Sequence, residues 1–132
     1  MLDPSREKMK RDLELLIGTE LLAINVEYSA VKLVFDLYGY TIININKMFH
    51  FVLDDGYQGE FDAATGCGDP QFILLRGAVC ESINFRDREI IIAFPGQASL
   101  QVIFLKKDFE PVIYTSTTTI GRDHHINFLH VM

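Results

Sequence analysis

The sequence lacks any apolar run approaching the roughly 18 residues of a membrane-spanning helix. It holds only two cysteines, Cys67 and Cys80, too few for a disulfide scaffold, so we expect reduced thiols. Residues 1–8 are charged and contain no signal-peptide core, which favours a cytoplasmic protein. These absences indicate a globular chain of 132 residues, 48% hydrophobic and 23% charged, long enough to form one domain with a sizeable core.

Lysine and arginine are absent between Lys47 and Arg76. The same interval contains five acidic residues: Asp54, Asp55, Glu60, Asp62 and Asp69. Residues 1–14, by contrast, contain four acids and four bases, so most of the net charge of −6 comes from the middle of the chain. An acidic field of this kind repels nucleic acid and attracts a basic partner.

Recognised catalytic motifs are also missing. There is no P-loop, no G-x-G-x-x-G, no G-x-S-x-G and no calcium-loop spacing among the acids. His124, His125 and His130 do not have the spacing of metal ligands, and Cys67 lies in acidic surroundings that raise a thiol pKa. We therefore expect no catalytic residue, no metal site and no cofactor.

The strongest pattern that is present is an internal repeat, in which residues 15–47 match residues 74–106 at an offset of 59. Leu-Leu-x-Gly occurs at the start of both copies, and Phe35 corresponds to Phe94. The alignment has seven identities in 33 positions, against roughly two expected from average composition. The sequence therefore predicts two copies of one structural unit.

The first copy predicts a helix followed by strands. Asp3-Pro4 is typical of a helix start, and Gly18 of a helix end with positive φ. An apolar stripe supports this helix: Met9, Leu13, Leu16 and Ile17. Period-two alternation then predicts strands over 22–28, 31–35 and 41–45, with 48–53 apolar enough for a fourth.

The second copy predicts the same plan, with a helix about two turns shorter between Asp69-Pro70 and Gly77. Alternating apolar residues predict strands over 83–85, 90–94 and 100–104, and later strands over 112–114 and 124–131. The expected fold is α+β and predominantly antiparallel β. Each pseudo-repeat is a short helix with a meander of three or four strands, and both pack as a single domain over 1–132.

The acidic segment 54–70 does not follow this plan, because its glycines and aspartates are typical of turns. It is either a solvated connector or a protein interface, since aromatic residues surrounded by charges are common anchors. For the second alternative we predict that the partner binds six residues: Asp54, Asp55, Tyr57, Glu60, Phe61 and Asp62.

Three features give the chain a resemblance to a known family: the Leu-x-Gly helix ends, the hairpin sequence VKLVFD at 31–36, and Phe109-Glu110 near the end. The chain resembles the contact-dependent growth inhibition immunity proteins of bacterial toxin systems over most of its length. The resemblance implies a cytosolic protein that binds and neutralises one cognate toxin, often a basic nuclease. The family has no shared catalytic residues to carry over.

Two other function classes stay open. A doubled unit of a helix and four strands is similar to the Whirly fold, which implies binding of single-stranded nucleic acid. That function needs a basic groove with stacking aromatics, whereas this chain has no basic cluster beyond Lys106-Lys107 and the balanced first helix. An enzyme with an unrecognised site is the other alternative, and turnover of a substrate would identify it.

Overall fold

The computed structural model describes residues 4–37, 40–86, 89–103, 113–118 and 125–127. The first half of the chain contains one helix and five strands: α1 Pro4–Glu14, β1 Leu21–Glu27, β2 Ala30–Phe35, β3 Tyr40–Ile45, β4 Met48–Val52 and β5 Gln58–Asp62. The remaining elements are β6 Cys67–Gly68, the 3₁₀ helix η1 Pro70–Leu75, β7 Ser82–Arg86, β8 Glu89–Ala93, β9 Ser99–Ile103, β10 Ile113–Thr118 and β11 His125–Asn127.

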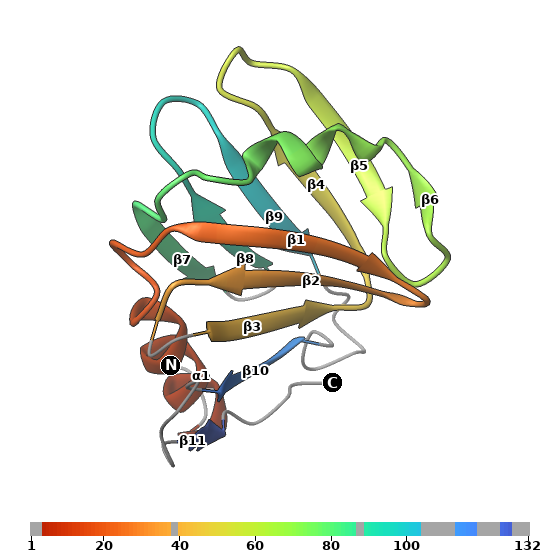
Figure 1. The fold of residues 1–132 in the computed structure, drawn as a ribbon. Coiled ribbons are helices and arrows are strands. Elements are labelled where there is room, and N and C mark those ends of the chain that lie inside the picture. The colour runs from red at the N-terminus through yellow and green to blue at the C-terminus, as the bar shows by residue number, and fades with distance from the viewer. Residues whose placement is uncertain (1–3, 38–39, 87–88, 104–112, 119–124, 128–132) are drawn as a thin grey trace.

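These strands form two sheets whose strand directions differ clearly (Figure 1). The five-stranded sheet has the order β1-β2-β3-β10-β11, and the six-stranded sheet has the order β6-β5-β4-β9-β8-β7. All pairings between named strands are antiparallel. The predicted α+β class with predominantly antiparallel β structure is confirmed.

Helix α1 ends at Glu14, earlier than the sequence predicted. Beyond it the backbone tightens, because the N–H groups of Leu16 and Ile17 bond to carbonyls three residues back, at 3.0 and 3.2 Å. The tighter turn buries Leu16 and leaves Ile17 44% exposed, so the predicted stripe stops at Leu16. No helix among the described residues is long and apolar enough to cross a membrane.

The two halves exchange strands. The turn Asn46–Lys47 connects β3 to β4, yet β3 pairs with β10 and β4 pairs with β9. The first half therefore supplies β4 and β5 to the sheet of the second half, and the second half supplies β10 and β11 to the other sheet. The expected fourth strand of the first meander is thus in the opposite sheet, and each sheet needs both halves.

The halves also meet at an antiparallel bridge between Glu20 and Val79, which are equivalent under the 59-residue offset. Four backbone hydrogen bonds surround the bridge: Gly18 N–H to Cys80 O (2.7 Å), Gly77 N–H to Leu21 O (2.7 Å), Cys80 N–H to Thr19 O (2.8 Å) and Leu21 N–H to Ala78 O (2.8 Å). When each residue is replaced by its repeat equivalent, 59 positions away, the first bond becomes the second and the third becomes the fourth. The backbone is therefore locally arranged about a pseudo-two-fold axis.

The pairing of the first two strands is the same in both halves under the 59-residue offset, but the pairing of the third strand differs. Ile24 lies opposite Leu33, and at the same offset Ile83 lies opposite Ile92. Val31 pairs with Ile45, however, whereas Ile90 pairs with Val102, two positions before the residue that the offset requires. An even shift keeps the same faces inward, so the core is preserved while the third strand slides.

One apolar cluster fills the space between the sheets. Six repeat positions that were expected to face a common interior are at most 2% exposed and belong to this cluster: Val31, Leu33, Phe35, Ile90, Ile92 and Phe94. The expected burial of β1 is wrong at its far end. Val26 is 51% exposed, and Tyr28, in the following turn, is 99% exposed. β1 is an edge strand, and its end extends past the core.

Replacing Phe35 or Phe94 by alanine should lower the free energy of unfolding by about 3–5 kcal/mol, because each ring is almost fully buried and alanine would leave a cavity. Urea denaturation followed by circular dichroism measures this change. The control is Tyr28→Ala, whose ring is exposed and whose removal should change stability by less than about 0.5 kcal/mol. Equal effects at all three sites would contradict the burial.

Gly18→Ala and Gly77→Ala should each destabilise the protein by about 1–2 kcal/mol. Both glycines have positive φ, 90° and 93°, as the sequence predicted, and no atom lies within 4 Å of an added Cβ. The cost is therefore backbone strain without a clash. The corresponding D-alanine substitutions, made by chemical synthesis, should restore stability, and a failure to do so would exclude strain as the cause.

Candidate functional site

The acidic segment is a folded β-structure. β5 pairs with β4 along its whole length, and β6 adds two residues at the edge. Two glycines permit this packing, because a Cβ at Gly59 would lie 2.6 Å from the Phe51 ring and a Cβ at Gly68 would lie 2.6 Å from the Glu60 carbonyl. The segment 54–70, in which the sequence indicated turns, thus also contains two strands, and its acidic residues are attached to a sheet.

Phe61 is 4% exposed, so its predicted role as an aromatic anchor on the surface is also wrong. Its ring centroid lies 4.9 Å from that of Phe72 and 5.9 Å from that of Phe49. Phe72, from η1, also contacts Phe49 edge-on at 4.9 Å. Aromatic pairs of this geometry contribute about 0.5–1.5 kcal/mol each beyond their burial. Phe61 therefore anchors the acidic hairpin to the core.

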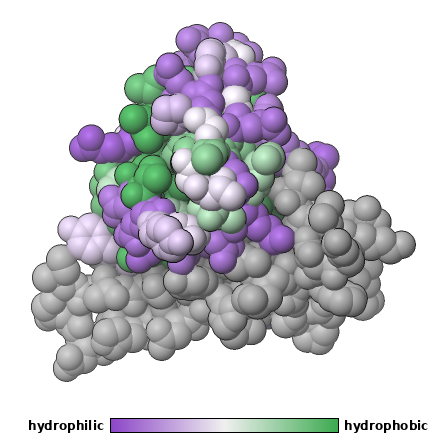
Figure 2. All heavy atoms as spheres, turned by 90° about the vertical axis from the view of Figure 1, so that its right-hand side faces the viewer, coloured by the Kyte–Doolittle hydropathy of each residue, from purple (hydrophilic) through white to green (hydrophobic). Residues whose placement is uncertain are grey.

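The tip of this hairpin, which we define as the turn 53–57, is closed by its own backbone. Leu53 N–H donates to the Tyr57 carbonyl at 2.8 Å, and Gly56 N–H donates to the Leu53 carbonyl at 2.9 Å. The Asp55 carboxylate accepts the Tyr57 N–H at 3.0 Å. Asp54 and Asp55 are both exposed on this closed turn, so their charges have a fixed position. The upper end of the molecule, where Figure 1 places the tip, is hydrophilic in Figure 2, above a hydrophobic area.

Tyr57 joins the hairpin to η1. Its hydroxyl donates to the Asp69 carboxylate, whose other oxygen accepts the Gln71 N–H at 3.0 Å and caps η1. The hydrogen bond to Asp69, then desolvation, and then the negative charge of Asp69 raise the pKa of Tyr57 above its ordinary value of 10.0. Tyr57 remains 44% exposed, so part of its ring is available to a partner.

The structure separates the predicted acids into two groups. Asp54 and Asp55 lie together at the tip, whereas Glu60 and Asp62 lie along β5. Asp62 is four residue steps along β5 from Gln58, at the tip end of the strand, which corresponds to roughly 13 Å, whereas Glu60 is two steps, or roughly 7 Å, from it. The roughly 13 Å exceeds the Debye length of about 8 Å at physiological salt, so Asp62 is largely screened from the tip, whereas Glu60 is not. Asp62 also accepts the Ala64 N–H at 3.0 Å in the following turn.

The outer face of β4 carries His50, opposite Glu60 on β5 and Gln101 on β9. A hollow of about 110 Å³ lies beside these residues. It is smaller than the roughly 300–1,000 Å³ of typical ligand pockets. The Gln101 side-chain amide donates to Glu89, which also pairs with Arg86 at 3.2 Å. This row of residues is therefore a polar surface ladder.

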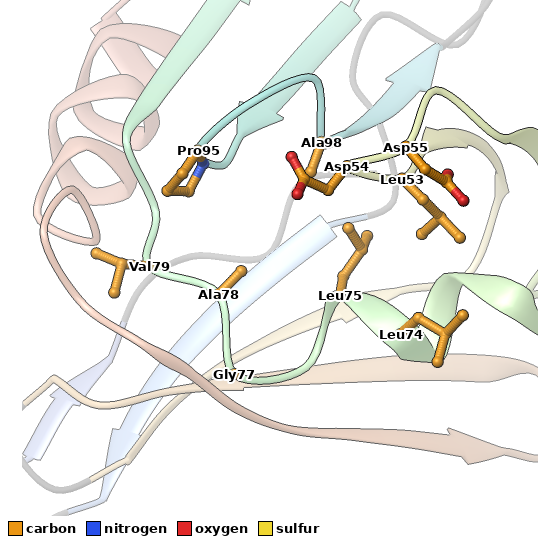
Figure 3. A pocket seen from close by; sticks show the side chains of 10 residues that line it. All are labelled: Leu53, Asp54, Asp55, Leu74, Leu75, Gly77, Ala78, Val79, Pro95 and Ala98. Atoms are coloured by element: carbon orange, nitrogen blue, oxygen red, sulfur yellow. The ribbon is translucent and has the colours of Figure 1, made fainter.

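A larger pocket of about 590 Å³ lies beside the tip, and Figure 3 shows its lining. Its walls come from three separate segments: the tip itself, the end of η1 with the connection that follows it, and the turn between β8 and β9. Sequence analysis did not identify this pocket. One sequence feature could have indicated the pocket: in the Leu-Leu-x-Gly motif, the two leucines are adjacent, so when Leu75 is buried, Leu74 is left on the surface.

The cysteines and histidines form no further site in the described part of the chain. Cys67 is exposed, and burial raises the pKa of the Cys80 thiol to about 11. No group of three or more metal-ligating side chains occurs among the described residues. His124 and His130 lie outside the described residues, and for His125 the structure describes β11 only as backbone.

Comparison with protein-family models, with curated proteins and with solved structures gives no match.

Asp69→Asn should lower the Tyr57 pKa toward its ordinary value, because an amide removes the negative charge beside the phenol. The stability that this bond contributes is present below the ordinary tyrosine pKa of about 10, and is lost as pH rises through the higher pKa of the folded state. NMR titration of ¹³Cζ-labelled tyrosine measures the pKa, and Tyr57→Phe assigns the resonance. An identical titration in Asp69→Asn would contradict the hydrogen bond.

Proposed function

We propose that this protein is an immunity protein that binds and neutralises a cognate protein toxin with a basic nuclease domain, in the cytoplasm. The observation that carries the proposal is the tip of the β4–β5 hairpin. It presents Asp54 and Asp55 on a turn closed by two backbone hydrogen bonds, in a stretch of sequence without lysine or arginine. A nuclease surface that binds phosphate is basic, and it matches this charge.

The rigidity of the hairpin supports binding rather than a linker role. The hairpin is hydrogen-bonded to β9 on one side, and its Phe61 ring packs on Phe72 beneath it. A binding surface that is already ordered loses little conformational entropy on association. The exposed part of Tyr57 adds an aromatic contact, which is common at the centre of protein interfaces.

The two alternatives are a Whirly-like binder of single-stranded nucleic acid and an enzyme with an unrecognised site. The two-sheet pseudo-repeat agrees with the first alternative in outline. A strand of phosphates, however, would meet Asp54, Asp55 and Glu60, which are exposed acids. The enzyme alternative requires turnover, and the two described pockets supply no nucleophile placed beside a base.

Neutralising the acidic hairpin should slow association with the toxin. The variant carries Asp54→Asn, Asp55→Asn, Glu60→Gln and Asp62→Asn, which keep the side-chain acceptors used in the turns. We expect an association rate lower on the order of tenfold at low salt, and a weaker dependence on salt, because steering by charge is lost. The partner for this test is the protein encoded by the neighbouring gene, and stopped-flow fluorescence measures the association rate.

A matched control removes the same number of charges from exposed acids elsewhere: Glu14→Gln, Glu20→Gln, Asp36→Asn and Glu81→Gln. It should change the rate much less than the hairpin variant. Equal rates for the wild type and the hairpin variant at all salt concentrations would move the interface to the strands around 115–125. A toxin that does not bind the wild type would reject the proposed function.

A further inference from the structure

The pocket beside the tip has a buried apolar floor and an exposed apolar rim. Leu53, Leu75 and Ala98 form the floor, at 7%, 3% and 6% exposure. Leu74 and Val79 lie on the rim, at 64% and 42% exposure. In Figure 3, Leu75 points from the end of η1 toward the tip, and Leu74 and Val79 lie toward opposite ends of the pocket. A concave surface with exposed large apolar side chains is typical of an interaction site.

The mouth of the pocket is acidic. Asp54 and Asp55 line it, and none of the ten lining residues is Lys, Arg or His. In the described part of the chain, no hydrogen bond or ion pair engages the Asp54 carboxylate, and Asp55 uses one oxygen for the Tyr57 N–H. Arg76, the cation in the connection from η1 to β7, points elsewhere and donates to the Leu22 carbonyl at 3.2 Å. The pocket therefore favours a cation that carries apolar groups.

The shape of the pocket is fixed before anything binds. The β8–β9 turn is closed by the Phe94 N–H bond to the Ala98 carbonyl, at 2.8 Å. Gly96 brings this turn against the tip, since a Cβ there would overlap the Asp54 carboxylate. The two turns thus hold the Asp54 charge over the apolar floor. A preformed site of this kind gains affinity because little has to be ordered on binding.

We propose that this pocket receives a short apolar–basic segment of a protein partner, with an apolar side chain on the Leu53–Leu75 floor and a Lys or Arg beside Asp54 and Asp55. The inference rests on the proposed function, because it names the part of the toxin that the acidic tip recognises. The pocket volume of about 590 Å³ is large enough for a few side chains of a partner segment.

The first test is an NMR titration of the ¹⁵N-labelled protein with acetyl-Gly-Leu-Arg-Leu-Gly-amide. Shift changes are expected at the amides of Ala78, Val79 and Ala98, which line the pocket. Replacing Arg by Gln in the peptide, or Leu by Ser, should weaken binding at least fivefold. Equal binding of the Gln peptide, or shift changes confined to other residues, would overturn the proposal. So would equal binding of n-butylammonium, which points to a small amine, or self-association of the protein through the pocket.

The variant that probes the apolar rim is Leu74→Ser, which should weaken binding of the peptide at least fivefold. Its matched control is Leu15→Ser, at the equivalent position of the first repeat, because Leu15 is 44% exposed but does not line the pocket. The charge variant is Asp54→Asn with Asp55→Asn, and its control is the exposed Glu14→Gln. Equal losses in a variant and its control would overturn the proposal.

Binding of the toxin separates this inference from the proposed function. If the toxin binds the wild type and Leu74→Ser equally, the pocket is not used, and the inference fails while the function stands. If the toxin binds Leu74→Ser at least fivefold more weakly and Leu15→Ser normally, both stand. If the toxin does not bind the wild type, the proposed function fails, and the inference, which names part of that toxin, fails with it.

Discussion

The exchange of strands between the two halves is the constraint on which the rest of this structure depends. β4 leaves the first half through a two-residue turn and completes the sheet of the second half beside β9. Because unpaired backbone groups at a sheet edge are costly to bury, neither sheet can form its core without strands from both halves. The acidic hairpin belongs to this exchanged pair of strands. Its position is therefore fixed by contacts between the halves as well as by contacts within one.

The aromatic contacts below the hairpin show how the fold supports the surface. Phe72 is fully buried and lies between rings from β4 and β5. Asp69 caps the helix that carries Phe72, and it also accepts the Tyr57 hydroxyl. Because the same short segment binds both the inner and the outer side of the hairpin, packing of the core and orientation of the tip are coupled. A substitution at Phe72 would therefore alter the orientation of the acidic turn.

Much of the fold could be predicted from the sequence, because turns and strands are marked by residues that lie close together in the chain. Gly18 and Gly77 mark two turns with positive φ, and alternation finds the buried faces of β2 and β8. β5 could not be predicted in this way. Its other four residues are Gln, Gly, Glu and Asp. Gly and Asp, and to a lesser degree Glu, are depleted in strands, and Phe61 alone carries the apolar signal.

The candidate site could be predicted only in part, for a different reason. The acids of the tip are adjacent in sequence, so a charge count finds Asp54 and Asp55. The pocket beside them combines Leu53, Leu75 and Ala98, which come from the β4–β5 turn, the end of η1 and the β8–β9 turn, far apart in the chain. The pairing of β4 with β9 brings the first and last of these together, and that pairing depends on the strand exchange. The local periodicity of the sequence does not indicate which strands pair across the two halves.

The bridge between Glu20 and Val79 bears on how many equivalent surfaces one chain can present. A residue that pairs with its own repeat equivalent has the geometry of an isologous dimer, but within one chain. In a dimer of identical chains, each binding surface would occur twice. Here the two members of each equivalent pair can differ. The connection after β4 contains Asp54 and Asp55 and no base, whereas the connection after β10, 119–124, contains one acid and one base. If the acidic tip binds a basic partner as proposed, this difference in sequence charge predicts one such partner per chain.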